Sequence, residues 1–139
     1  MPPIAVLLTV DALLMGGAAR PGARAMLEAL DAQGVPTAVL ASDESAGIRS
    51  LLETLELIPN ALVGAGDGLA TVPEPDLIFR ACEVLGVAPW EVLVVGGSNL
   101  DKHAAATAGA LFAGIDGVAG NFTITNHAEV LAIVDGTHP

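Results

Sequence analysis

The side chains of this chain that could do chemistry follow apolar runs of strand length. Asp11 comes two residues after Thr9 at the end of the first run, Ser42 follows a second run, and Asp101 comes three residues after Ser98 behind a later one. A carboxylate at such a place can transfer protons, and carboxylates can hold a hard cation. Each also has a plainer interpretation, because Asp11 can cap a turn and Asp101 can lie in a helical first turn that favours negative charge.

The elements that must position these residues alternate along the chain. Apolar runs predict strands over residues 4–10, 36–41, 61–65, 91–95 and 111–115. Segments of helical period lie between them, and a last helix is expected near 127–134. This alternation predicts an α/β fold: a doubly wound (Rossmann-like) parallel sheet of about five strands with helices on both faces.

In a doubly wound sheet, ligands bind beyond the carboxyl ends of the strands, where the strand order reverses. The strand ends therefore predict one pocket, to which the loop around residue 72 also belongs. The residues expected there are Thr9, Asp11, Ala41, Ser42, Val72, Gly97, Ser98 and Asp101. Other residues are weaker candidates for a functional site. His103 and His127 are expected on the surface, and Trp90 is expected to pack over a sheet edge. Residues 64–68 are interpreted as a flexible glycine-rich loop.

Composition limits the class of protein. The 139 residues are expected to form a single domain over residues 1–139, and 53% of them are hydrophobic. With 16 acidic against 5 basic residues, the net charge of −11 argues against nucleic acid or a membrane surface as a partner. The first apolar run is broken by Asp11, so no signal or membrane segment is expected, and a cytoplasmic protein is predicted. The single Cys82 excludes an internal disulfide.

The low share of charged residues, 15%, leaves apolar surface to be covered. We therefore expect a homo-oligomer, with a two-fold dimer as the commonest closed form, and a protein partner remains open.

Several segments together resemble the haloacid dehalogenase-like (HAD) superfamily. They read, in chain order, LTVDALL, GVPTAVLAS, TVPEPDLIFRACEVLGVAP and EVLVVGGSNLDKHAAATAGA. The resemblance covers about residues 4–134 and implies a Mg²⁺-dependent phosphohydrolase. In that family an aspartate at the end of the first strand forms an aspartyl-phosphate, and a second aspartate two residues on is the acid/base. The short stretch between Thr9 and Ala41 implies a member without a cap domain.

This sequence departs from the family pattern at most of the matched positions. Thr9 stands at the nucleophile, whereas Asp11 keeps the acid/base position. Ala41 stands at the phosphate-binding hydroxyl, for which Ser42 could partly substitute. The family's lysine is replaced by Val72 and a metal-binding aspartate by Gly97, so only the distal Asp101 remains, with Ser98 beside it. In a second register Asp11 itself would be the nucleophile, with Leu13 at the second aspartate position.

Two hypotheses follow from the resemblance and its gaps. The first is a protein of this fold that has lost phosphohydrolase chemistry, binds no cofactor and acts through binding or assembly. The alternative is a Mg²⁺-dependent, phosphatase-type hydrolase that uses Asp11 and Asp101 as catalytic and metal-binding carboxylates. A doubly wound binding domain unrelated to the family is a third possibility, which the Pro-x-Pro-Asp start of a helix at Pro73 argues against.

Overall fold

The computed structural model describes residues 2–42, 45–64 and 69–138. The strands are β1 Ala5–Thr9, β2 Leu14–Met15, β3 Ala18–Ala19, β4 Thr37–Ala41, β5 Ala61–Gly64, β6 Val92–Gly96, β7 Leu111–Gly114 and β8 Phe122–Thr123. The helices are α1 Val10–Leu13, α2 Ala23–Ala32, α3 Ser45–Thr54, α4 Asp76–Leu85, α5 Asn99–Ala108 and α6 Ala128–Asp135, with a 3-10 turn η2 over Pro89–Glu91.

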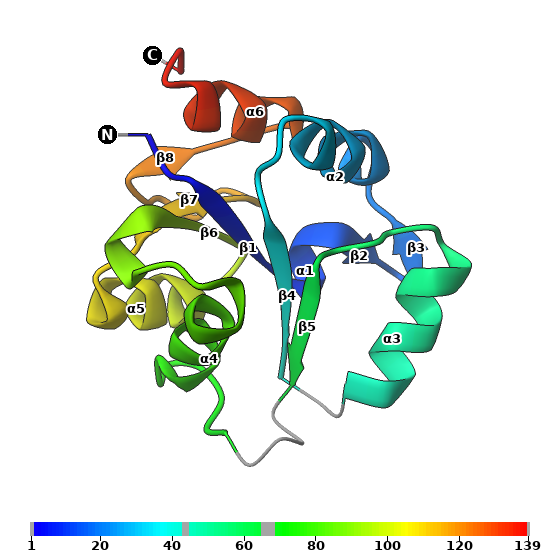
Figure 1. Cartoon of the computed structure of the whole chain (residues 1–139), viewed down its shortest axis with the longest axis horizontal. Helices are drawn as coiled ribbons and strands as arrows, with labels where there is room; N and C mark the ends of the chain where they lie inside the picture. Colours follow the sequence, from blue (N-terminus) through cyan, green and yellow to red (C-terminus); the bar gives the residue numbers. More distant parts are fainter. Residues whose placement is uncertain (1, 43–44, 65–68, 139) are drawn as a thin grey trace.

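The main sheet has the strand order β5-β4-β1-β6-β7-β8, and every pair in it is parallel (Figure 1). The chain first adds strands on one side of β1 and then crosses to the other, so the order reverses at β1. The doubly wound α/β prediction is confirmed, with six strands where about five were expected. The extra strand, β8, is two residues long and too short to produce a periodic signal.

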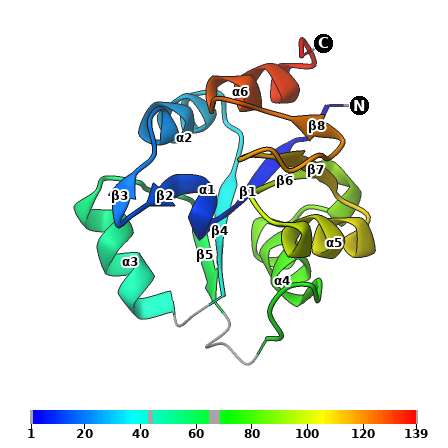
Figure 2. The same cartoon turned by 180° about the vertical axis from the view of Figure 1, so that it is seen from behind.

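Helices cover both faces of the sheet, as the views from the two sides show (Figures 1 and 2). Alternate residues of β1 enter two separate cores, because successive side chains of a strand point to opposite faces. Val6 and Leu8 pack in the core beneath α2, α3 and α6, whereas Ala5 and Leu7 pack in the core beneath α4 and α5. β1 is therefore buried on both sides, which fixes the position of its carboxyl end.

The segment after β1 differs most from the prediction. The strand expected over residues 4–10 ends at Thr9, and α1 begins at once with Val10. A two-stranded hairpin follows, in which Leu14 pairs with Ala19 and Met15 with Ala18. Its turn is made by Gly16 and Gly17, whose φ angles of 62° and 79° suit glycine. The apolar run continues past Thr9, so its composition alone could not show where the strand stops.

Two further expectations are corrected. His127 is buried, with 7% of its surface exposed, because it lies at the start of α6 where that helix packs toward α1. Trp90 is 76% exposed and does not cover a sheet edge.

Within the described residues, no helix is long and apolar enough to cross a membrane. The glycine-rich loop expected at 64–68 falls, after its first residue, outside the described residues.

Candidate functional site

A pocket of about 330 Å³ opens at the carboxyl ends of β1 and β4, next to the start of α5. It lies where the strand order reverses, the place at which doubly wound sheets bind ligands. The pocket is lined by Thr9, Val10, Asp11, Leu40, Ala41, Ser42, Ile48, Val72, Ser98, Leu100 and Asp101. The fold thus brings seven of the eight expected residues together, and Gly97 alone of that set is not part of the lining.

Thr9 and Asp11 reach the pocket from the end of β1. Thr9 precedes α1 with extended backbone angles of φ −72° and ψ 160°. Its side chain is buried, and its hydroxyl oxygen has no hydrogen-bond partner among the described residues. Asp11 lies in the first turn of α1 and is exposed. The abrupt change from strand to helical turn places a hydroxyl and a carboxylate at one edge of the sheet.

Asp101 reaches the pocket from the first turn of α5. The hydroxyl oxygen of Ser98 caps this helix by accepting a hydrogen bond from the Asp101 backbone N–H at 3.1 Å. Asp101 is 8% exposed and packs closely on Gly96, where a Cβ atom would lie only 2.8 Å from the Asp101 Oδ2. Ser98 is thus a helix cap, as its place in the sequence suggested, and Gly96 makes room for the carboxylate.

The carboxylates of Asp11 and Asp101 interact electrostatically in the pocket. Burial raises the pKa of Asp101 above its ordinary range, and the negative charge of Asp11 raises it further. Hydrogen bonds from Ser98 and from the Gly97 backbone oppose this rise. No lysine or arginine occurs in the described lining of the pocket. The site therefore combines negative charge with hydroxyl groups, and the two carboxylates would favour the binding of a cation.

Position 97 faces a different neighbourhood. A Cβ atom on Gly97 would lie 3.2 Å from the Oδ2 of Asp116 and 3.2 Å from the Ile115 side chain. Asp116 in turn forms a bidentate ion pair with Arg20, at 2.8 and 3.1 Å. The sequence gives no sign of this pair, because Arg20 and Asp116 are 96 residues apart and neither belongs to a local motif. Their meeting depends on the folded sheet.

Comparison with known proteins now decides the family. The profile of the haloacid dehalogenase-like hydrolase family matches residues 4–109. The chain belongs to this family. The resemblance seen in the sequence is thus confirmed, and the match includes β1, β4 and β6 and the pocket between them.

Curated relatives of the chain are phosphoglycolate phosphatases. The Escherichia coli (strain K12) protein is 33% identical over 85 residues, which are 60% of this chain and 34% of that protein. The Rhodospirillum rubrum protein is 38% identical over 98 residues, which are 69% of this chain and 41% of that protein. The chain therefore spans about a third to two-fifths of the length of these relatives.

Solved structures share the fold. A HAD family hydrolase from Deinococcus radiodurans, solved with bound phosphate and sodium, has a TM-score of 0.74 at 28% identity. That match covers 86% of this chain and 60% of the other. The core domain of a putative phosphoglycolate phosphatase from Streptococcus pneumoniae has a TM-score of 0.77 at 19% identity, with 97% of both chains covered. The second match supports the fold alone.

These findings correct the first hypothesis about function. We expected a protein that had lost phosphohydrolase chemistry and acted through binding or assembly, since Thr9, Val72 and Gly97 replace residues of the family pattern. The curated relatives are phosphatases and a solved relative binds phosphate, so that expectation is wrong and the hydrolase alternative fits better. Reasoning from three positions gave too little weight to the rest of the matching chain.

Proposed function

We propose that this chain is a phosphatase-type hydrolase that cleaves small phosphate monoesters in the pocket at the end of β1. One observation carries the proposal: the fold brings the carboxylates of Asp11 and Asp101 into a single pocket at the point where the strand order reverses. The phosphatase activity named for its relatives supports the same reaction class.

Asp11 is the proposed acid/base. Its carboxylate takes a proton from the attacking water while the oxygen of that water bonds to phosphorus. The bond from phosphorus to the ester oxygen breaks, and Asp11 returns the proton to that oxygen, so the products are an alcohol and inorganic phosphate. The exposure of Asp11 at the pocket suits this role, because the proton must reach water and substrate.

Three residues with hydroxyl groups line the same pocket as Asp11. Ser42 is exposed at the end of β4 and can donate a hydrogen bond to a phosphoryl oxygen. The hydroxyl oxygen of Ser98 already accepts a hydrogen bond from the Asp101 backbone N–H, so Ser98 serves to cap α5. The buried hydroxyl of Thr9, at the end of β1, has no partner among the described residues.

The residues present fit a bound Mg²⁺, the cation that the family implies. In the part of the chain that the structure describes, no cluster of three or more His, Cys, Asp or Glu side chains could hold a metal. Mg²⁺ commonly uses only one or two protein carboxylates and completes its shell with water and phosphate oxygens. Asp101 would supply such a carboxylate, while the carboxylate of Asp11 stays free of the cation for proton transfer. The cation would neutralise the paired negative charges and polarise the phosphoryl group.

The substrate is expected to be small. A pocket of about 330 Å³ lies at the low end of the volumes of small-molecule sites. The apolar side chains of Ile48, Val72 and Leu100 form part of the wall, so we expect the organic group of the phosphate ester to contact mainly apolar side chains.

The test is release of inorganic phosphate from a panel of small monoesters that includes 2-phosphoglycolate and p-nitrophenyl phosphate. Each ester is assayed with millimolar Mg²⁺ and again with excess chelator. We expect Mg²⁺-dependent turnover that Asp11→Asn abolishes. Turnover no faster than that of heat-denatured protein, over the whole panel, would contradict the proposal.

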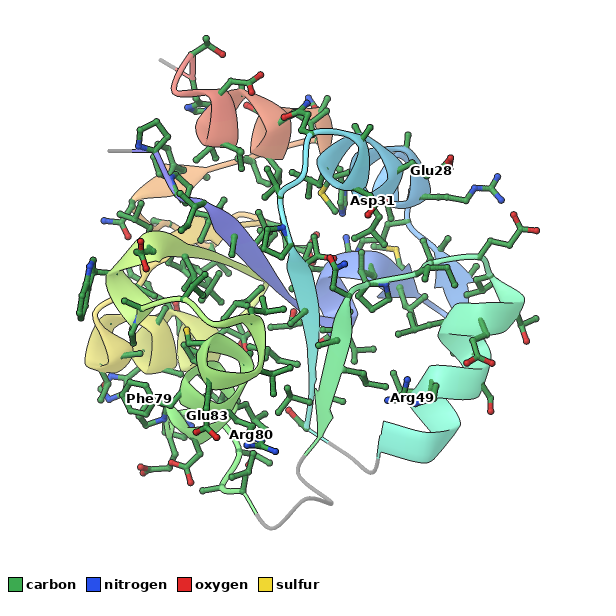
Figure 3. The ribbon with its side chains drawn as sticks, viewed as in Figure 1. Glu28, Asp31, Arg49, Phe79, Arg80 and Glu83 are labelled. Atoms are coloured by element: carbon green, nitrogen blue, oxygen red, sulfur yellow. The ribbon has the colours of Figure 1, made fainter. Side chains whose placement is uncertain are left out.

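A matched variant separates the role of Asp11 from a general effect of lost charge. Asp31 is an exposed aspartate at the end of α2, just before β4 begins, and so lies at the opposite edge of the sheet from the pocket (Figure 3). Asp31→Asn makes the same chemical change and should leave turnover unaltered. Equal losses in the two variants would show that Asp11 has no special part in the reaction.

A further inference from the structure

The helical turn that carries Asp11 has a hydrogen-bond partner for every one of its carbonyl groups. The Val10 carbonyl accepts from the backbone N–H of Leu14, which caps the turn. Arg20 serves two of the others: its backbone N–H donates to the Leu13 carbonyl at 2.8 Å, and its Nε donates to the Asp11 carbonyl at 2.6 Å. The remaining carbonyl, that of Ala12, accepts from the buried imidazole of the histidine at the start of α6.

This last contact joins the Nε2 of His127 to the Ala12 oxygen at 2.6 Å, across 115 residues of sequence. We call Arg20 and His127, with these bonds, the carbonyl clamp. A helix leaves its last carbonyls without partners inside the helix, and a turn of 4 residues has no stable ladder of its own. The clamp supplies those partners from outside the turn, so the turn is held by distant parts of the fold.

Arg20 is itself held in place. Its side chain is 12% exposed, and both of its terminal nitrogens bind the carboxylate of Asp116, at 2.8 and 3.1 Å. The guanidinium keeps the pKa of the Asp116 carboxyl below its usual range. Asp116 adopts a φ of 54°, an uncommon value outside glycine. Gly97 has no side chain to press on this pair, since a Cβ there would lie 3.2 Å from Asp116.

We propose that Arg20 is a positioning residue for Asp11: by binding the Asp11 carbonyl, it fixes the turn from which the carboxylate reaches into the pocket. The inference rests on the proposed function for the chemistry that Asp11 performs. A guanidinium at the carbonyl end of a helical turn also opposes the partial negative charge there. Arg20 does not line the pocket, so its loss should affect the reaction through the geometry of Asp11.

The test compares Arg20→Met with Arg24→Met. Arg24 is a matched control, because it lies on α2 and its hydrogen bonds and ion pairs within the described residues go to Glu56, at 2.9 Å, and Glu28, both outside α1. Hydrogen exchange by mass spectrometry then follows peptides that cover residues 10–14. We expect exchange there to rise about tenfold or more in Arg20→Met and to stay unchanged in Arg24→Met.

Kinetics give the second measurement. A displaced Asp11 should lower kcat by about 10- to 100-fold while KM changes by less than about threefold, because the phosphate-binding surface is kept. General destabilisation would not divide the two constants in this way. A raised KM at unchanged kcat, or unchanged exchange over residues 10–14, would overturn the proposal.

Two further arms keep the test decisive. If Arg20→Met does not fold, Arg20→Lys keeps the charge and loses the planar fork, and the same faster exchange and lower kcat are expected. If the wild type releases no phosphate, the proposed function fails, and the exchange measurement still decides whether Arg20 holds the turn.

Discussion

Replacing Thr9 with valine removes one buried hydroxyl and keeps the shape of the side chain. The Thr9 oxygen is buried at the end of β1, with no hydrogen-bond partner among the described residues. A buried hydroxyl without a partner has lost its hydration and gained nothing in return, which costs about 1–3 kcal/mol. Thr9→Val removes that cost, so the free energy of unfolding should rise by about 1–2 kcal/mol.

The shift in melting temperature follows from the size of the chain. Unfolding entropy is about 2.1 cal/mol/K per residue, so 1 kcal/mol moves the midpoint of a chain of 139 residues by about 3–4 °C. We therefore expect Thr9→Val to raise Tm by about 3–7 °C in scanning calorimetry without Mg²⁺.

Thr37 is the matched control. It is also a buried threonine on a central strand, but its hydroxyl donates to the Asn60 side chain at 3.3 Å and accepts from the Asn60 backbone at 3.3 Å. Thr37→Val leaves Asn60 without these partners and should lower stability by about 1–3 kcal/mol. The same substitution thus has opposite signs at the two positions. A loss of stability in Thr9→Val equal to that in Thr37→Val would refute the reasoning, because it would show that the Thr9 hydroxyl is satisfied.

The remaining predictions concern the pocket and the assembly. Because the pKa of Asp101 is raised in the folded chain, stability should fall as the pH rises from 3.8 through the raised value. Asp101→Asn should remove this fall in stability, which urea unfolding at a series of pH values would show. The same variant should also remove any rise in Tm that Mg²⁺ causes in the wild type. Gly96→Ala would place a Cβ 2.8 Å from the Asp101 Oδ2, so it should lower turnover at least about tenfold while the circular dichroism spectrum is kept. Gly97→Asp would bring a second carboxylate beside Asp116 and should lower Tm, an effect that Asp116→Asn should partly reverse. Sedimentation velocity should show a dimer at micromolar concentration, and a single species of 13.9 kDa would contradict that expectation.

Local sequence predicted the parts of the site that depend on neighbouring residues. Ser98 and Asp101 are three positions apart at the start of a helix, and the cap between them uses only groups within one helical turn. Apolar runs of strand length predicted the strands of the sheet interior, because a strand covered on both faces must be apolar along its whole length. From those strands the doubly wound order, and hence the edge where Asp11 and Asp101 meet, could be inferred.

Only the tertiary structure decided what surrounds those carboxylates. His127 reads as a surface residue in the sequence and is buried against Ala12, and Arg20 meets Asp116 across 96 residues. The end of β1 at Thr9 was equally hidden, since the apolar run continues into Val10, the first residue of α1. The physical reason is the same in each case: periodicity and capping are set by residues within one or two turns, whereas the partner of a buried polar group is set by whichever distant segment the sheet order brings beside it.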